Sequence, residues 1–196
     1  MRPLIAAAVA MIPLLLARPA WAGPVDFECD VPPNRASSVD QAVPGPAVTI
    51  SGRISFVLAR GGRYSPMASV AVIGGWGSGG ATLRMIGQPR SGANASSAAS
   101  GARAAGAVAG GPPSAGDPFA VDILVRTAAG QRNVTLGTLP AATTDAPFSI
   151  VVGADGAASV SVGGLAARIM LAPLMAPRVR LLCSSGQFAF HAVEAR

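Results

Sequence analysis

The 196-residue chain is 51% hydrophobic and 12% charged, and its formal net charge is +6 at pH 7. This length suffices for one domain with a buried core. All fifteen basic residues are arginines, and they are scattered along the chain rather than clustered, so the positive charge indicates no nucleic-acid partner.

The N-terminal segment predicts a cleaved, helical secretory signal peptide over residues 1–22. Arg2 supplies a positive start, Leu4–Leu16 is apolar, and Ala20-Trp21-Ala22 is an A-x-A cleavage site. An uncleaved membrane anchor is the alternative, but the apolar run is shorter than the ~20 residues that a spanning helix needs. We therefore expect a periplasmic or secreted chain with no membrane span after cleavage.

The beginning of the mature chain, residues 23–46, is polar and interrupted by prolines. Only Val25–Val31 is expected to form a short strand in this part. Val48–Leu58 is the first long strand candidate, and Gly52 interrupts its alternation in a manner typical of a β-bulge.

The next segment, Ala68–Gly87, predicts two strands around a Gly-rich connection. Residues 75–80 (GWGSGG) match the G-x-G-x-x-G pattern of dinucleotide-binding proteins. That motif must open a helix, whereas Ala81–Ile86 is typical of another strand. We therefore expect a β-turn with an exposed aromatic residue and no nucleotide cofactor.

Low-complexity sequence rich in Ser, Ala and Gly occupies Ser91–Gly116. It contains too few large apolar side chains to offset the entropy of ordering, which predicts a mobile loop within a single domain of residues 23–196. A two-domain chain with this segment as linker is the alternative. It is disfavoured because residues 23–89 alone would form only a marginal domain.

The C-terminal half predicts antiparallel pairs of strands. Phe119–Arg126 and Gln131–Thr138 form one pair, and Asp122 and Arg126 share one face of its first strand. Pro147–Gly164 contains two alternating runs joined by Asp-Gly, a strong hairpin signal. The apolar residues 165–174 suit a strand or a short helix, and residues 178–194 form an apolar run, a Ser-Ser-Gly turn and a final strand. The mature chain is thus expected to contain nine or ten strands.

Two cysteines remain after signal removal, Cys29 near the beginning and Cys183 near the end. In an oxidising compartment, an even number of cysteines most simply indicates one disulfide. This bond would hold the first mature strand against residues 178–183. A nucleophilic Cys183 activated by His191 is the competing hypothesis. It lacks a third orienting group and leaves Cys29 without a role.

This succession of strands and turns predicts an all-β fold, an antiparallel β-sandwich of jelly-roll type. Asp155-Gly156 in a late hairpin, and Gly186 before Phe188 and Phe190 in the last strand, resemble the C-terminal half of concanavalin A-like (laminin-G-like) jelly rolls, the lectin and glucanase superfamily. The resemblance covers Phe119–Val193. It implies a sandwich that binds carbohydrate.

The sequence departs from the catalytic and metal-binding patterns of that superfamily. Its glycoside hydrolases carry paired carboxylates on one strand in a Glu-x-Asp-x-x-Glu-like array, but the glutamates of the mature chain are only Glu28 and Glu194. One histidine and two paired cysteines cannot form an ordinary zinc site. A calcium site needs several converging oxygen ligands, whereas the central aspartates occur singly, at Asp117, Asp122, Asp145 and Asp155. We therefore expect a non-catalytic member without metal or cofactor.

Trp76 and Tyr64 are the candidate ligand-binding residues. They are the only tryptophan and tyrosine of the mature chain, and both adjoin Gly-rich turns. Aromatic rings at such positions can lie against the face of a sugar, although packing against the protein is the common alternative.

Two functions from different classes follow. The first is an exported non-catalytic binding module whose partner is a glycan or another component of the cell envelope. The second is a structural or adhesion subunit that joins envelope partners through exposed edge strands. An enzyme of unrecognised type ranks third.

Overall fold

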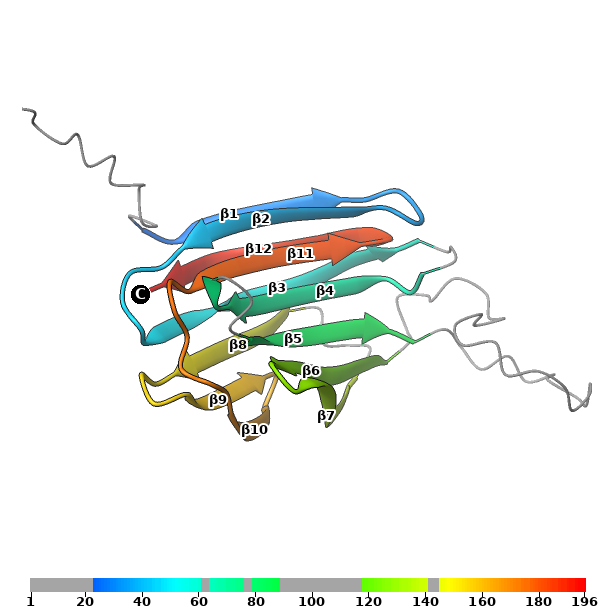
Figure 1. Ribbon diagram of the computed structural model, residues 1–196. Coiled ribbons are helices and arrows are strands. Elements are labelled where there is room, and N and C mark those ends of the chain that lie inside the picture. Colours follow the sequence, from blue (N-terminus) through cyan, green and yellow to red (C-terminus); the bar gives the residue numbers. More distant parts are fainter. Residues whose placement is uncertain (1–22, 61–63, 76–78, 89–117, 141–144) are drawn as a thin grey trace, which may run out of the picture.

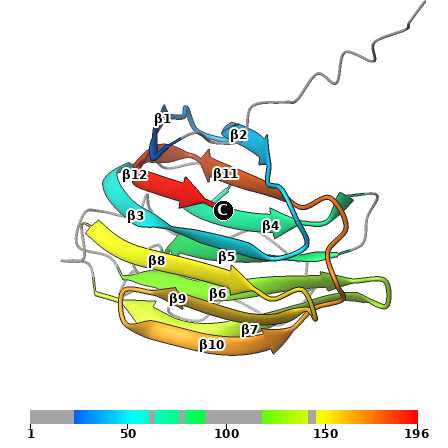
Figure 2. The ribbon, with the colours of Figure 1, turned by 90° about the vertical axis from the view of Figure 1, so that its left-hand side faces the viewer.

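The computed structural model describes residues 23–60, 64–75, 79–88, 118–140 and 145–196, which form two six-stranded antiparallel sheets lying face to face (Figures 1 and 2). The sheet order is β1-β12-β3-β8-β9-β10 in sheet A and β2-β11-β4-β5-β6-β7 in sheet B. The predicted all-β antiparallel sandwich is confirmed. The predicted signal peptide and the segment Ser91–Gly116 lie outside the described residues.

The strands, in chain order, are β1 (Val25–Asp30), β2 (Ala36–Ala42), β3 (Val48–Ala59), β4 (Met67–Ile73), β5 (Gly80–Gly87), β6 (Phe119–Thr127), β7 (Gly130–Leu139), β8 (Asp145–Val152), β9 (Ala157–Val162), β10 (Leu165–Met170), β11 (Arg178–Ser184) and β12 (Gly186–Ala195). One edge of the sandwich is formed by β1 and β2, and the opposite edge by β7 and β10 (Figures 1 and 2).

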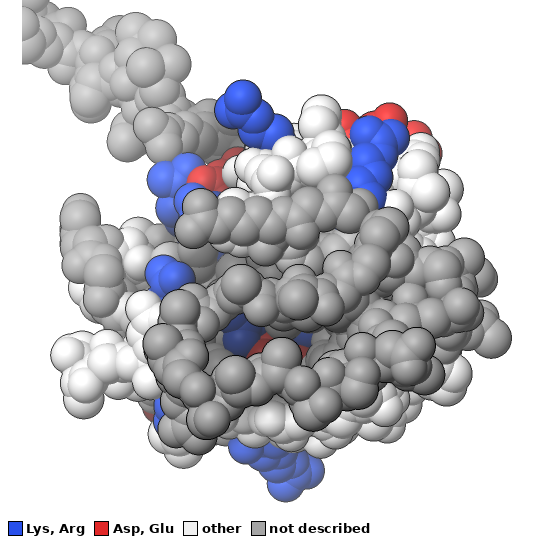
Figure 3. Space-filling model, turned by 90° about the vertical axis from the view of Figure 1, so that its right-hand side faces the viewer, with Lys and Arg blue, Asp and Glu red and all other residues white. Residues whose placement is uncertain are grey.

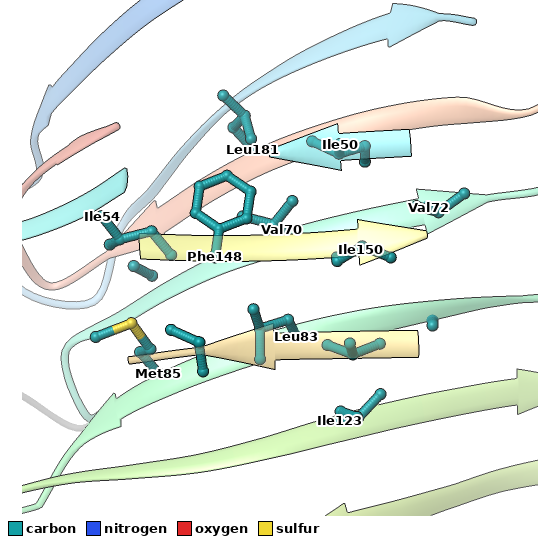
Figure 4. Packing of buried hydrophobic residues seen from close by; sticks show 14 of the residues in the cluster. Ile50, Ile54, Val70, Val72, Leu83, Met85, Ile123, Phe148, Ile150 and Leu181 are labelled. Atoms are coloured by element: carbon teal, nitrogen blue, oxygen red, sulfur yellow. The ribbon is translucent and has the colours of Figure 1, made fainter. Parts of the chain in front are cut away.

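Period-two alternation places every second side chain in a single core between the sheets. Ile50 and Ile150 of sheet A face Val70 and Leu83 of sheet B, and all four are fully buried (Figure 4). Burying each such side chain contributes about 1.5–3 kcal/mol, so the core is the main source of stability.

The β8–β9 hairpin forms as predicted from the Asp-Gly signal. Gly156 has a φ of +86°, and the N–H of Gly153 donates to the carbonyl of Ala157 at 2.8 Å. A Cβ at Gly156 would overlap the carbonyl oxygen of Leu171, so this turn needs glycine for both its conformation and its packing.

The sequence prediction missed β2. This strand is polar and lies at the edge of sheet B, where it pairs only with β11. Among its residues only Val39 packs against the core cluster. An edge strand with one contact of this kind lacks the apolar alternation on which strand prediction relies.

The bulge expected at Gly52 lies on the neighbouring strand instead. β3 and β8 stay in register through Gly52. The pairing of β12 with β3, in contrast, shifts register between His191 and Glu194, and Ala192 in this interval has a φ of +48°. Gly52 serves packing, because a Cβ there would lie 3.0 Å from a ring carbon of Phe148.

The last two strands belong to different sheets rather than to one hairpin. β11 lies in sheet B, and β12 lies in sheet A between β1 and β3. Between them Ser185 is fully buried with a φ of +49°; its N–H donates to the carbonyl of Arg35, and its carbonyl accepts from the N–H of Arg60. The chain therefore crosses from sheet B to sheet A at a hydrogen-bonded corner.

Cys29 of β1 and Cys183 of β11 are joined in a disulfide, with a Cα–Cα distance of 6.6 Å. The predicted disulfide is confirmed and holds β1 against β11, although the two strands lie in different sheets, since the sheet partner of β1 is β12. The bond therefore links sheet A to sheet B across the core, beside the edge formed by β1 and β2.

We predict that loss of this bond destabilises the sandwich strongly. Closing a loop of 154 residues corresponds to roughly 5 kcal/mol in the chain-entropy treatment, and typical removals cost about 2–5 kcal/mol. Urea unfolding of a Cys29→Ala/Cys183→Ala variant should show a loss in this range. Adding reductant should then lower the midpoint of the wild type and leave that of the variant unchanged; equal stability of the two proteins would contradict the prediction.

The connection between β5 and β6 should be replaceable by a short turn. The two strands are antiparallel neighbours, and Gly87 is the register partner of Phe119, so the ends of the connection lie side by side. Replacing residues 91–116 with a short Gly-Ser linker should leave the thermal midpoint within a few degrees of the wild type. A chain that no longer folds would show that this segment is needed by the sandwich.

Candidate functional site

The outer face of sheet B carries small side chains along β4. Ser69 and Ala71 point away from the core, because the alternating residues Val70 and Val72 belong to the core cluster. Ser69 and Ala71 are nevertheless only 4% and 3% exposed. Longer side chains on the flanking strands therefore stand beside β4 and shield its small residues.

On one side these longer side chains are Arg180 of β11 and Asp40 of β2. Arg180 is the register partner of both Ala71 and Asp40, and its Nε and Nη2 donate to the two carboxylate oxygens at 2.6 and 2.8 Å. The hydrogen bond from Arg180 lowers the pKa of Asp40, against a smaller opposing effect of burial, and it raises the pKa of Arg180. This side is thus a charge-assisted, bidentate pair.

On the other side Arg84 of β5 pairs with Asp122 of β6. Arg84 is the register partner of Ser69, and its Nε and Nη2 donate to Asp122 at 2.6 and 2.7 Å. Nη2 also donates to Oδ1 of Asn133 at 3.3 Å. The two charged side chains are 21% and 19% exposed, so they are held more firmly than a surface pair.

A cavity of about 230 Å³ runs along β4 between the two pairs. We call it the β4 groove; its lining includes Ser69, Ala71, Thr82, Arg84, Arg126 and Arg180. Figure 3 shows the end of the molecule at which β5 stops, where basic and acidic side chains of the described residues lie side by side near the upper edge.

The groove offers hydrogen-bond donors in fixed directions. A guanidinium has five N–H bonds. Asp40 occupies two of those of Arg180, and Asp122 and Asn133 occupy three of those of Arg84. Each arginine therefore keeps donors that a ligand can use, while its carboxylate partner fixes the plane of the group.

Tyr64 lines a second hollow at the beginning of β4. We call it the Tyr64 hollow; its volume is about 370 Å³ and its lining is mostly apolar. Arg35, Met67 and Ile86 also line it. The Tyr64 side chain is 56% exposed. Met67 lines both the Tyr64 hollow and the β4 groove, so the two are neighbours on one face.

Trp76, the other predicted ligand-binding residue, lies outside the described residues. Gly75 and Gly79 on either side of it lie at the end of β4 opposite Tyr64. The role of Trp76 and Tyr64 in binding stays a prediction.

The hypothesis of a Cys183–His191 nucleophile is wrong. Cys183 points into the core and is disulfide-bonded, so it has no thiol to activate. His191 lies on the outer face of sheet A, where it is the register partner of Arg53. The bonded sulfur and the imidazole thus belong to different sheets and different faces.

The described glycines of the glycine-rich motif lie in close contact with neighbouring strands and loops. β4 and β5 are antiparallel neighbours, which excludes the strand–helix unit of a dinucleotide site. Gly79 has a φ of +106°, and a Cβ there would lie 2.6 Å from the carbonyl oxygen of Arg126. Glycine at this position therefore lets the start of β5 approach β6 closely.

Sequence reasoning did not find the two arginine–aspartate pairs. Their partners are 38 and 140 residues apart in the chain, so they meet only through strand order. The alternation placed Asp122 and Arg126 on one face of β6, but their partners on β5 and β2 could not be read from it. The missed strand β2 also concealed Asp40.

In the part of the chain that the structure describes, no group of three or more His, Cys, Asp or Glu side chains is arranged to hold a metal ion. No helix in those residues is long and apolar enough to cross a membrane.

No protein-family description matches the chain, and no curated protein matches it. Among solved structures it is similar to an alginate lyase from Pseudomonas aeruginosa, with a TM-score of 0.50 and 16% identity over 77% of this chain; the chain spans 64% of that lyase. It is also similar to an alginate lyase from Alteromonas (TM-score 0.48, 10% identity, 76% of this chain and 71% of that chain). A third similar structure is the carbohydrate-binding module CBM66 from Bacillus subtilis. Its TM-score is 0.43 and its identity 9%, and the match covers 86% of this chain and 85% of that module.

The two six-stranded sheets and the likeness to the Pseudomonas structure identify the fold as a concanavalin A-like jelly-roll sandwich. The resemblance inferred from the C-terminal residues is confirmed at the level of the fold.

The Asp40–Arg180 pair should make a pH-dependent contribution to stability. The pKa of Asp40 is lower in the folded chain than in the unfolded one, so the contribution is complete above the ordinary aspartate pKa of about 3.9 and disappears as the pH falls through the lowered value. At pH 7 the coupling should be no more than about 1 kcal/mol, because both side chains are partly exposed. A double-mutant cycle with Asp40→Asn and Arg180→Met, measured by urea unfolding at pH 7 and at about pH 2, tests this. The same coupling at both pH values would contradict it.

Proposed function

We propose that the protein is an exported, non-catalytic glycan-binding module that holds its ligand in the β4 groove. The observation that carries this proposal is the arrangement of two bidentate arginine–aspartate pairs on either side of the small residues Ser69 and Ala71. A glycan presents a row of hydroxyl groups, and oriented donors and acceptors beside a flat, small-residue floor suit such a ligand.

The carboxylates of the groove support binding rather than glycoside hydrolysis. Asp40 and Asp122 lie on strands four places apart in sheet B, which corresponds to about 19 Å at the usual strand spacing. Inverting glycosidases hold their two carboxyls at most about 9.5 Å apart, and retaining ones hold them closer. Asp40 also accepts hydrogen bonds from Arg180, which lowers the pKa of Asp40 and favours its charged form over a proton-donating acid.

Export is supported by the Cys29–Cys183 bond, since structural disulfides persist in oxidising compartments. Together with the signal peptide predicted for residues 1–22, the bond favours a periplasmic or secreted module whose partner is an envelope or extracellular glycan. Alginate is a suitable first acidic probe, because the similar Pseudomonas structure is an alginate lyase and because the groove contains the exposed Arg126. Cello-oligosaccharides provide a neutral comparison.

A glycan array that includes both probes, followed by calorimetry, tests the proposal. Arg180→Gln should weaken binding at least tenfold because it removes donors from the groove. Arg53→Gln is the matched control: Arg53 also pairs with an aspartate, Asp145 at 2.6 Å, but on the outer face of sheet A. Ala71→Arg, which fills the groove floor, should abolish binding, and circular dichroism should show that each variant keeps the β-sandwich.

Absence of glycan binding by the wild type, or equal losses in Arg180→Gln and Arg53→Gln, would contradict the proposal. Concentration-dependent assembly of a wild type that binds no glycan would support the alternative of a structural subunit joined through edge strands.

A further inference from the structure

The β4 groove and the Tyr64 hollow lie end to end along one strand. The groove extends from Gly80 and Arg126, which are in register with Ile73 at the end of β4, to Met67 at its first residue. The Tyr64 hollow begins at Met67 and continues past the start of the strand. The two cavities therefore lie in line along β4 with Met67 between them, and we refer to them together as one depression.

This depression is long and narrow. β4 itself spans seven residues, about 20 Å at the rise of an extended strand, and the Tyr64 hollow adds to the length of the depression. Its width is set by Arg180 on β11 and Arg84 on β5, the strands on either side of β4, and corresponds to about 10 Å. These proportions suit a chain molecule better than a single sugar.

The two ends of the depression differ chemically, and each carries an exposed side chain. Tyr64, which is more than half exposed, presents an aromatic ring at one end. At the other end Arg126 is the register partner of Gly80, is exposed, and has no hydrogen-bond or ion-pair partner among the described residues. A ligand can therefore extend beyond the depression in both directions.

We propose that the ligand is an internal stretch of a linear polysaccharide that lies along β4, with one sugar ring stacked on Tyr64 and another hydrogen-bonded by Arg126. This inference rests on the proposed glycan-binding function and adds the ligand's form, its direction and its two end contacts. Arg84 and Arg180 hold the middle of the chain, Arg126 holds one end of it, and Tyr64 is a specificity-determining residue that acts only on ligands long enough to leave the groove and reach it.

The test measures affinity as a function of ligand length. Calorimetry with two ladders from disaccharide to hexasaccharide, one of alginate and one of cello-oligosaccharides, should show at least one ladder whose hexasaccharide binds tenfold or more tightly than its disaccharide. Tyr64→Ala should weaken hexasaccharide binding severalfold and leave disaccharide binding unchanged, and Arg126→Ala should weaken hexasaccharide binding more than disaccharide binding. Tyr64→Phe should retain the wild-type affinity, because the ring is kept.

Arg132→Ala is the matched control, since Arg132 is an exposed arginine on β7 that does not line the groove. It should bind both lengths as the wild type does. Equal affinity for both lengths, or equal losses for both lengths in Tyr64→Ala and Arg126→Ala, would overturn this inference while leaving glycan binding intact. Failure of both ladders to bind the wild type would instead contradict the proposed function together with this inference.

Discussion

The size of the outward-facing side chains on β4 is the constraint on which the site depends. The side chains of Val70 and Val72 pack in the core. The side chains at the alternate positions, Ser69 and Ala71, point outward and are too short to fill the space between the arginines of β11 and β5. A long side chain at position 71 would join the two arginine–aspartate pairs into one continuous surface. The groove exists because one central strand is small on its outer face while its neighbours are long.

The disulfide supports the same region from the other side of sheet B. Cys183 lies three residues after Arg180 on β11, and its bond to Cys29 ties this strand to sheet A across the core. β2, which supplies Asp40, is an edge strand that pairs with β11 alone. Edge strands open more readily than central ones, so anchoring β11 limits the motion of the wall formed by Arg180 and Asp40. Stability and ligand binding are thus connected through β11.

Local sequence patterns predicted much of the fold, and the errors have physical causes. The Asp155-Gly156 turn, the alternation of β8 and β9, and the strand pair of β6 and β7 are local signals, and each forms as expected. β2 was missed because an edge strand needs little apolar surface. The register of β1 and the separation of β11 from β12 depend on contacts between distant residues. The groove was missed for the same reason, since Arg180 and Asp40 meet over 140 residues of sequence. Of the predicted ligand-binding residues, Tyr64 lies beside the groove.

The central claim is that a glycan occupies the outer face of sheet B. Backbone amide NMR during titration with an alginate or cello-oligosaccharide hexamer tests it most directly, because the amide chemical shifts of each strand are observed separately. The account predicts chemical-shift changes concentrated on β4, β5 and β11, including Ser69, Ala71, Arg84 and Arg180, with the outer face of sheet A around Arg53 unchanged. Changes centred on sheet A, or saturable binding of a hexamer that leaves β4 unaffected, would contradict the account.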